Sequence, residues 1–582
     1  MQEQNKDSRP QGESAKHKVS RRTIVAGAAW ATPVVMIASA SPALAATSGS
    51  GMACRVNEYF TTKGGGKFLN GSLFNLNLDA IAEVYGVDVL NTPLSGTPNV
   101  TKEPATGPTP GYTDRTDGVV DAWANPLNVG VLEALQVSLG DVTQPLGAIL
   151  NIAETGVLNQ YGLARENGLS RGFAGLVSNT GGVTLSDVQS APAFGNINLK
   201  TVIANLAGPT LANLVEPLTA LNLNIGAVGA QAEIDSCLTT QSRDYHIASA
   251  DLTVGSDVLV NALDPVVGQG GAIDAVNNAV NGLTAEGGLL SDLVTNLVSA
   301  LNVLNLGLVR VKAGSETGTN VAVSIDLDPV RKLLADPLVT DALSLSLTDA
   351  DKMLFLDLDA LVGSLNDQAA NTRVLPANAA VIDPLLSDIS TFLNQLPDTV
   401  VAALQDAVNA ATVKLDLKVA LQYNRGILTA DWVDAGAINI LLDTTLGELM
   451  DGAAALKVTL NSDVPVVGPL LAAIVNPLLA GLAVTLNGLL ATAGSAINDL
   501  LTPLISNVGT LLEGVAGPVL TDLLDPLLMG LLGGGSEPGL INLTVNVQEG
   551  AYDVAALKLS VLPSGGIDVV LAKAYAGENL AV

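Results

Sequence analysis

Pairs of carboxylates are the residues of this chain whose types and spacing come closest to supporting chemistry. Asp326 and Asp328 form one pair, and Asp357 and Asp359 form the other. Because residues i and i+2 of a strand face the same side, each pair is expected on one face of its strand. Two acids that face each other across a cleft, about 5–10 Å apart, can hydrolyse glycosides. Aromatic residues that would bind a sugar make up only 3% of the chain, so we favour a solvated strand face that ends in a helix cap.

Two other candidate sites have weaker patterns. Residues 114–118 read Asp-Arg-Thr-Asp-Gly and Asp121 follows, which resembles part of a Ca²⁺ loop but lacks the closing Glu of an EF-hand, so a plain polar turn is preferred. His246, in Arg-Asp-Tyr-His at 243–246, is the one histidine after residue 45 and cannot build a multi-histidine metal site. We interpret it as structural. We expect no catalytic, cofactor-binding or metal-binding residues and predict that the protein is not an enzyme.

The elements that would position these residues recur along the chain. An alternating apolar and polar run is followed by a polar residue and an apolar helical stretch near 73–81, 197–203, 323–330, 355–361 and 438–444. Alternation with a period of two predicts a half-buried strand. An Asp after the strand can accept the first free N–H groups of a helix, and Pro329 suits a first helical position. The repeated unit is therefore predicted to be a strand, a capped turn and a helix.

Further strands are predicted from alternation, and the last three resemble an antiparallel meander with a turn at Glu549-Gly550. These strands cover 247–261, 306–313, 413–423, 427–433, 541–548, 555–562 and 566–573. Residues 46–66, which end in three consecutive glycines, are interpreted as a loose start. The predicted fold class is α+β, with antiparallel β-sheets faced by Leu/Ala-rich amphipathic helices in an elongated, multi-domain chain.

The segment 464–532 has two interpretations. No charged side chain occurs between Val464 and Asn498, which is long enough to span a bilayer. Prolines and glycines interrupt this stretch, its larger apolar residues form a helical stripe, and flanking Lys/Arg and Trp/Tyr are missing. We therefore favour buried amphipathic helices over a membrane span. The protein is expected not to be an integral membrane protein after signal removal.

The N-terminus is typical of an exported protein. Arg21 and Arg22 precede a mild apolar run, and Ala43 and Ala45 supply the small side chains of an A-x-A cleavage site. The paired arginines indicate the twin-arginine route. We predict a signal peptide over residues 1–45 and a mature protein that is secreted, extracellular or at the cell surface.

Composition restricts the partners and suggests one covalent link. The chain has 27 Lys and Arg against 56 Asp and Glu, a net charge of −29. Because residues 1–45 carry six basic and three acidic side chains, the mature part has a net charge of −32. Such a surface repels phosphate backbones, so we expect no nucleic-acid partner. Cys54 and Cys237 are the two cysteines, and in an exported chain a disulfide between them is favoured over two buried free thiols.

These signals divide the chain into four parts. A length of 582 residues suits several domains. Residues 1–45 are the signal and 46–245 an N-terminal domain that contains both cysteines. Residues 246–400 form a middle strand–helix domain, and 401–582 a C-terminal domain with long apolar helices and the terminal meander.

Several runs of the mature chain carry a family resemblance. They are 65–73, 76–79, 122–129, 156–161, 243–250 and 545–549. In combination they resemble the choice-of-anchor G family of exported actinobacterial proteins. The resemblance implies an extracellular or surface protein with no established activity, often with a varied C-terminal envelope anchor. This chain ends in Gly-Glu-Asn-Leu-Ala-Val with no LPxTG-like motif, so we expect release or non-covalent retention.

Two functions from different classes fit these observations. The favoured one is an exported, non-enzymatic cell-envelope or secreted protein with an adhesive or structural role, whose partners are envelope components or other surface proteins. The alternative is an extracellular carrier of lipid or another apolar ligand, with Leu-rich helices lining a cavity. A glycosidase built on the carboxylate pairs is a third, less favoured hypothesis.

Overall fold

The structure is a computed structural model of the full chain. It describes residues 58–73, 76–78, 86–93, 99–101, 122–127, 133–134, 136–139, 142–152, 157–177, 183–189, 191, 194–206, 215–305, 308–316, 320–375, 379–426, 430–461, 468–533, 539–562 and 566–582. These residues belong to one compact unit that spans 54–582. Its strands form antiparallel sheets on which helices pack, so the predicted α+β class is confirmed.

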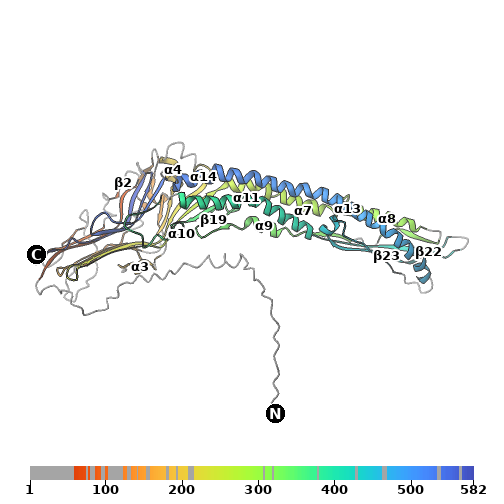
Figure 1. The fold of residues 1–582 in the computed structure, drawn as a ribbon, viewed down its shortest axis with the longest axis horizontal. Coiled ribbons are helices and arrows are strands. Elements are labelled where there is room, and N and C mark those ends of the chain that lie inside the picture. The colour runs from red at the N-terminus through yellow and green to blue at the C-terminus, as the bar shows by residue number, and fades with distance from the viewer. Residues whose placement is uncertain are drawn as a thin grey trace, which may run out of the picture. The chain divides into compact units, whose positions relative to one another are not determined.

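The largest sheet joins early and late parts of the chain. Its strands are Phe60–Leu73 (β1), Leu76–Asn77 (β2), Val87–Asn91 (β3), Asn99–Thr101 (β4), Thr372–Leu375 (β21), Ile541–Val547 (β25), Asp553–Val561 (β26), Ile567–Ala576 (β27) and Leu580–Ala581 (β28). The order is β21-β25-β26-β27-β1-β3-β4, and β2 and β28 also pair with β1 (Figure 1). The predicted terminal meander is confirmed, because β25, β26 and β27 are consecutive antiparallel neighbours.

A second sheet packs face to face on the first, with the backbones of the two sheets close together. Its strands, in spatial order, are Thr240–Ile247 (β14), Val228–Asp235 (β13), Leu169–Val177 (β10), Val157–Ala164 (β9) and Ala122–Ala124 (β5). β1 lies against β9 and β10, and β27 lies against β10 and β13. A Cβ added to Gly66 would overlap the carbonyl oxygen of Phe173, and one added to Gly172 would overlap that of Gly65. Stacked sheets usually lie about 10 Å apart because side chains separate them. At these positions glycine has no side chain, so the two backbones are in contact.

The prediction that residues 46–66 form a loose segment is wrong for residues 60–66. Residues 60–66 lie in β1, and Gly64, Gly65 and Gly66 are buried. A run of glycines resembles a flexible linker when only the sequence is considered. In the structure these glycines are instead required for the packing of the two sheets, because no side chain fits between the sheets at these positions.

Two more sheets and a hairpin complete the β structure. The third sheet, in spatial order, is Leu338–Val339 (β18), Leu343–Leu345 (β19), Leu354–Asp357 (β20), Ala250–Ser256 (β15), Leu218–Ile225 (β12), Gly195–Asn198 (β11) and Leu150–Ile152 (β8). The fourth is Val309–Glu316 (β16), Thr412–Asn424 (β22), Trp432–Thr445 (β23) and Lys457–Asn461 (β24), with Asn320–Ser324 (β17) also paired to β22. Gln136–Leu139 (β6) and Val142–Pro145 (β7) form the hairpin.

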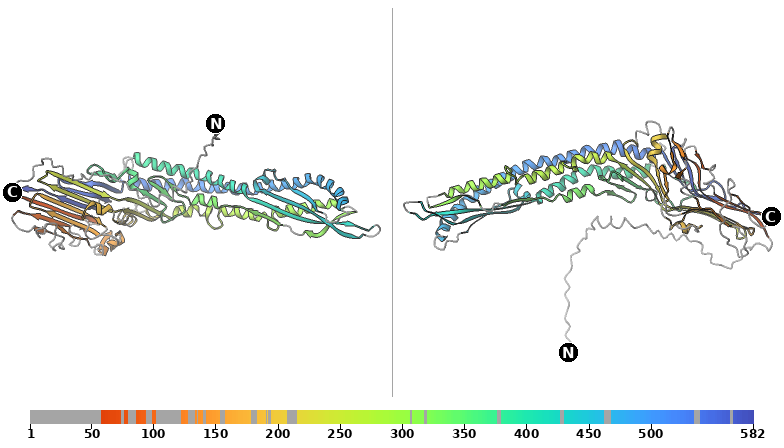
Figure 2. Two further views of the ribbon diagram at one scale, coloured as in Figure 1. Left: turned by 90° about the horizontal axis from the view of Figure 1, so that it is seen from below. Right: turned by 180° about the vertical axis from the view of Figure 1, so that it is seen from behind.

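Five of the described helices contact one long helix, and the others pack mainly on strands or on α11 (Ala379–Ala410). The helices are Leu185–Gln189 (α3), Leu199–Leu206 (α4), Asp257–Val267 (α6), Ala272–Gly282 (α7), Leu289–Ala300 (α8), Asp328–Ala335 (α9), Leu358–Val362 (α10), Ala379–Ala410 (α11), Leu446–Met450 (α12), Gly468–Pro518 (α13) and Asp525–Leu532 (α14). Leu146–Ala148 (η3) and Leu301–Leu304 (η4) are 3₁₀ turns, and Val519–Leu524 (η5) is π-helical. α13 contacts α6, α7, α8, α11 and α12, and α11 runs beside it in all views (Figures 1 and 2).

The buried face of α13, continued into η5, follows an eleven-residue repeat. One set of buried side chains is Val475, Leu486, Ile497, Val508 and Val519, and a second set four residues later is Leu479, Leu490, Leu501, Leu512 and Leu523. Eleven residues make three turns of about 3.67 residues, so the repeat keeps nearly the same face of a straight helix buried. The sequence predicted several helices here, and the structure has one continuous helix of 51 residues.

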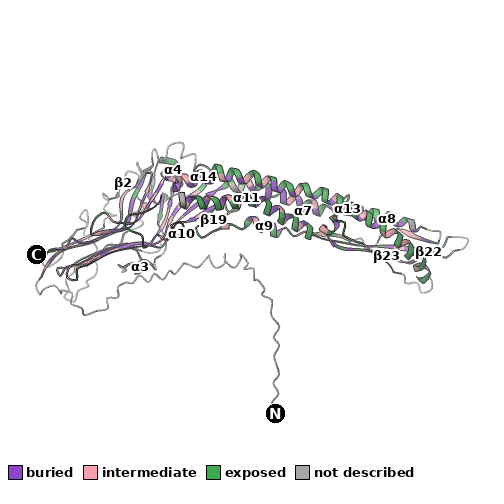
Figure 3. Ribbon diagram, in the orientation of Figure 1, coloured by how far each residue is buried: buried purple, intermediate pink, exposed green. Residues whose placement is uncertain are grey.

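The prolines of α13 do not break it, because they lie on its exposed face. Pro477 and Pro503 both point away from the packed stripe, and Figure 3 shows the alternation of exposed and buried turns along this helix. A proline inside a helix frees the carbonyl four residues earlier. On the exposed face that carbonyl can bind water instead, which removes most of the penalty.

One helical stretch among the described residues, Val475–Leu532, is long and apolar enough to cross a membrane. Its solvent-facing side carries Asn, Thr, Pro and Gly together with Asp499 and Glu513, while most of its large apolar side chains face the protein. On this distribution we keep the prediction of a packed amphipathic helix.

Each described unit has its strand, turn and helix in the predicted order, and the expected side-chain cap is confirmed at the starts of α4 and α10. The N-cap residue of α9, Leu327, makes no side-chain cap bond. Asn198 ends β11 and accepts the Thr201 N–H at 3.0 Å as α4 begins. Asp357 ends β20 and caps α10, and Pro329 stands in the first turn of α9. Thr445, rather than the expected Asp443, caps α12 through a capping box. The remaining unit, near 73–81, lies partly outside the described residues.

Two expected strands change at their ends. The strand predicted over 247–261 stops at Ser256, whose hydroxyl accepts the Val258 N–H at 3.2 Å and starts α6. β23 begins at Trp432, later than the strand predicted over 427–433. The predicted boundaries at 245/246 and 400/401 fall inside β14 and α11, and residues 54–582 cluster as one compact unit.

Candidate functional site

A cluster of polar and aromatic side chains lies at the end of the β22–β23 hairpin. The strand register places Arg310 of β16 opposite Gln422 of β22, which in turn lies opposite Asp434 of β23. Trp432 precedes Asp434 by two residues and therefore shares its face of the sheet. Lys312 completes the group, which we call the hairpin-end cluster.

Charge-assisted contacts hold the cluster together. The guanidinium carbon of Arg310 lies 4.3 Å from the centre of the Trp432 ring, a cation–π contact. Arg310 Nε donates to Gln422 Oε1 at 3.0 Å, and Gln422 Nε2 donates to Asp434 Oδ1 at 3.0 Å. Lys312 Nζ reaches both carboxylate oxygens of Asp434 at 3.2 Å. The hydrogen bond from Gln422, followed by that from Lys312, lowers the pKa of Asp434.

The cluster differs in charge from the rest of the protein. Arg310 and Lys312 outnumber Asp434 in it, in a chain whose net charge is −29. Its members are only partly buried, and Lys312 and Asp434 keep 42% and 64% of their side-chain surface exposed. A guanidinium, an ammonium, an amide and an indole on one sheet face suit recognition of anionic or hydroxyl-rich groups.

The carboxylate pairs are separated by the fold and serve as caps. Asp357 Oδ1 accepts the N–H groups of Asp359 and Ala360 at 2.9 and 3.1 Å. Asp359 lies in α10, where its Oδ1 accepts the Leu365 N–H at 2.7 Å. The expectation that the two share a strand face is therefore wrong, since β20 ends at the first of them. Asp326 likewise follows the end of β17 and accepts the Asp328 N–H at 3.0 Å.

A third carboxylate, which the sequence did not single out, joins the second pair. Asp251 of β15 is half-buried and lies opposite Asp357 in the strand register. Burial, followed by the charges of Asp357 and Asp359, raises the pKa of Asp251 to about 6. No group of three His, Cys, Asp or Glu side chains among the described residues has the geometry of a metal site. The charges of Asp357 and Asp359 thus disfavour the ionised form of Asp251 within the fold.

His246 belongs to a structural contact between β14 and a loop. Asn366 of that loop bonds to both main-chain groups of Ile247, accepting from its N–H at 2.9 Å and donating to its carbonyl at 2.8 Å. Tyr245 Oη donates to the Leu365 carbonyl at 2.9 Å. Burial lowers the pKa of His246 despite the nearby Asp367. The lowered pKa favours the neutral form of His246 beside this junction.

One serine spacing in the chain resembles a hydrolase motif and was missed by sequence reasoning. Residues 168–172 read Gly-Leu-Ser-Arg-Gly, which matches G-x-S-x-G. In hydrolases that serine stands exposed on a sharp turn between a strand and a helix. Ser170 instead lies buried within β10, and its hydroxyl bonds to Asn579 Oδ1 at 3.0 Å. The local geometry is that of a strand, not of a nucleophile turn.

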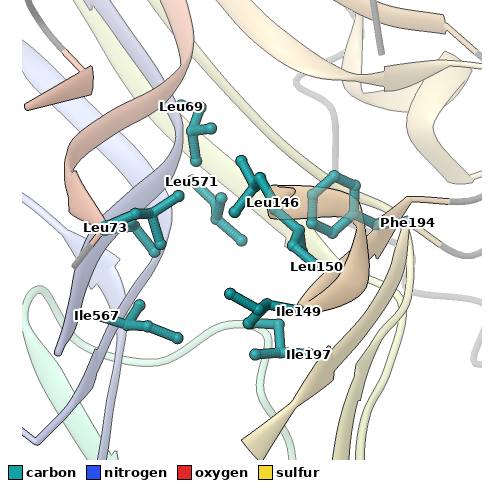
Figure 4. Close-up of a pocket in the computed structure, with 10 residues that line it drawn as sticks. Leu69, Leu73, Leu146, Ile149, Leu150, Phe194, Ile197, Ile567 and Leu571 are labelled. Atoms are coloured by element: carbon teal, nitrogen blue, oxygen red, sulfur yellow. The ribbon is translucent and has the colours of Figure 1, made fainter. Parts of the chain in front are cut away.

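Two cavities bear on the carrier hypothesis. The first lies between the largest sheet and the third sheet, where Leu73, Leu571, Ile149 and Phe194 point toward one another (Figure 4). Its lining is entirely apolar, and its volume of about 10 Å³ is room for one water at most. The second, about 330 Å³, is a more open groove between α6 and the end of α13.

Several predicted site residues cannot be placed. Arg21, Arg22, Ala43, Ala45 and Cys54 lie outside the described residues, as does the acidic segment 114–121. Cys237 is described, in the turn between β13 and β14, where its N–H donates to Asp235 Oδ1 at 2.9 Å. The Cys54–Cys237 disulfide therefore stays a prediction.

Comparison with known proteins identifies the family. A family model described as a domain of unknown function (DUF8394) matches residues 64–577. The chain belongs to this family. No curated protein matches the chain, and no solved structure matches it either. The DUF8394 region runs from the buried glycines of β1 to the residue after β27, so it contains the strands of all four large sheets except β28 and the first four residues of β1.

Within this DUF8394 chain, sequence reasoning missed the hairpin-end cluster. Its residues are 124 positions apart at most, and none forms a recognised motif. The composition of the sequence offered one signal. Tryptophan occurs three times in 582 residues, so Trp432, within a predicted strand, could have been recognised as a candidate binding residue. The strand register supplied the rest.

Proposed function

We propose that this protein is an exported cell-envelope or secreted protein that acts by adhesion rather than by catalysis, and that the hairpin-end cluster is its contact surface. The observation that carries the proposal is the stack of Arg310 on Trp432, flanked by Lys312, on a partly exposed sheet face. Tryptophan and arginine supply much of the binding energy at protein surfaces. An excess of basic charge at one place in an acidic protein favours contact with an anionic or hydroxyl-rich partner.

The export signal and the family resemblance support the same proposal. The twin-arginine signal would bring the protein outside the cell, where envelope polymers and other surface proteins are the available partners. The runs that resemble choice-of-anchor G proteins fall in β1, β5, β9, β14 and β25, which belong to the two face-to-face sheets. We propose that these sheets are a scaffold and that the β22–β23 hairpin makes the contact.

The experiment is co-sedimentation of the purified mature protein with envelopes isolated from the producing cells. We expect the wild type to sediment, and both Trp432→Ala and Arg310→Ala to bind at least several-fold less. Arg331→Ala is the matched control, because Arg331 of α9 forms a partly exposed ion pair with Asp274 of α7 at 3.0 Å and is not a member of the cluster. Equal binding of the Trp432 variant and the wild type would refute the contact surface. A hydrolytic turnover that one carboxylate substitution abolishes would refute the non-enzymatic assignment.

The alternative function is a carrier of an apolar ligand. Its support is the all-apolar lining of the cavity between the sheets. At about 10 Å³ that cavity would have to widen many-fold to hold an acyl chain. Native mass spectrometry of the secreted protein tests this alternative, and a co-purifying lipid is the result that would favour it.

A further inference from the structure

The groove between α6 and the end of α13 has the size of a ligand site. Its volume is about 330 Å³, within the range of small-molecule pockets. Val519 and Leu523, one helical turn apart, are buried beside it, and Val258 of α6 stands 40% exposed next to it. An exposed valine against a hollow of this size leaves apolar surface that a ligand could cover.

Two local features of the chain lie at the groove. The chain becomes π-helical over Val519–Leu524, directly after Pro518, and such widened turns often accompany functional sites. One turn earlier, Gly514 contributes no side chain, and a Cβ added there would meet no atom within 4 Å. The glycine is therefore not required by close packing. Its effect is to leave the groove open.

The charge at the groove selects the type of ligand. Asp522 is the one ionisable side chain among the described residues that line it, and its Oδ1 accepts the Thr521 hydroxyl at 3.0 Å. The nearby start of α6 offers no free anion site at Val258, because the Ser256 hydroxyl accepts that N–H. The protein as a whole is strongly acidic. An anionic head group is thus disfavoured and a cationic one is favoured.

We propose that the groove binds a compact apolar molecule that carries one protonated amine, with the apolar part against the exposed Val258 and Pro518 and the ammonium beside Asp522. The site does not depend on the adhesive function, since it lies on other elements and is tested on the purified protein alone. If the protein is a carrier, this groove would be its pocket and an apolar amine would be its class of ligand.

The probes are octylammonium, octanol and octanoate, titrated into the full-length mature protein by calorimetry at pH 7. We expect octylammonium to bind about threefold or more tightly than octanol, the range of a partly exposed ion pair, and octanoate to bind most weakly. Equal affinity of all three probes would overturn the assignment of the ligand class. Lack of saturable binding by any probe would overturn the site.

Two pairs of variants locate the site. Gly514→Leu fills the groove and is expected to lower octylammonium affinity more than tenfold, whereas Gly517→Leu, at an equally open exposed position of α13 outside the groove, leaves it unchanged. Asp522→Asn should bring octylammonium to the affinity of octanol, whereas Asp499→Asn makes the same change of net charge elsewhere on α13 without effect. Unchanged binding in Gly514→Leu, or equal losses in both aspartate variants, would refute the site. Because glycine is a poor helix former, both leucine variants should fold.

Discussion

Asp251 on β15 lies directly opposite Asp357 on β20, so two carboxylates face each other across an antiparallel pair. Like charges in this arrangement destabilise a sheet. Asp357 cannot move away, because its Oδ1 holds the first N–H groups of α10. Burial, followed by the charges of Asp357 and Asp359, therefore raises the pKa of Asp251 to about 6.

This relationship predicts a pH dependence of stability. The unfolded pKa of Asp251 is 3.8 and the folded one is about 6, so the folded state binds more protons between these values and stability falls as the pH rises through them. Asp251→Asn should be more stable than the wild type by about 1 kcal/mol above pH 6.5, after allowance for solvent screening of a partly exposed group, and equal to it near pH 4. Chemical denaturation at both pH values measures the difference. Asp499→Asn, which makes the same change of charge on the exposed face of α13, is the control.

A second prediction concerns the glycines between the two packed sheets. Gly172→Ala places a methyl group against the carbonyl oxygens of Gly65 and Tyr575 and should lower the free energy of unfolding by about 3 kcal/mol or more. Gly488→Ala is the control, because a Cβ on that exposed helical residue meets no atom within 4 Å. It should raise stability by about 0.5–1 kcal/mol. Similar effects of the two substitutions would show that the sheets do not pack as described.

A third prediction concerns Asn366. Its amide pairs with both main-chain groups of Ile247, whose side chain is fully buried, so Asn366→Ala leaves a donor and an acceptor with no partner. The expected loss is about 2 kcal/mol. Asn371 makes the same paired contact with Gln548 in an exposed position and has a φ of 59°. Asn371→Gly keeps that conformation accessible and should lose less, since water can replace the amide. A denaturation series on both variants decides the ranking.

A fourth prediction is the Cys54–Cys237 disulfide. Peptide mapping of the unreduced secreted protein should recover the two cysteines in one linked peptide pair. Reduction should then lower stability by up to about 5 kcal/mol, as should Cys237→Ser, and the double serine variant should match the single one. Quantitative alkylation of both thiols without reduction would contradict the pairing.

Local patterns in the sequence determined the parts of this fold that depend on neighbouring residues. Period-two alternation located β22 and the terminal meander, and polar residues after strands marked the starts of α4 and α10. The apolar stripe identified α13 as amphipathic. These features are set by side-chain spacing and by capping within a few residues, so the sequence is sufficient to predict them.

Tertiary structure decided what depends on distant partners. The sequence predicted a loose segment at the glycine run 64–66, whereas the structure has a buried strand there. Another sheet occupies the space that side chains would need. The tertiary structure also separated Asp357 from Asp359 by ending β20 between them, and it brought Asp251 to face the first of these. The hairpin-end cluster and the α6–α13 groove likewise arise only when strand register and helix packing join residues far apart in the chain, which no local pattern encodes.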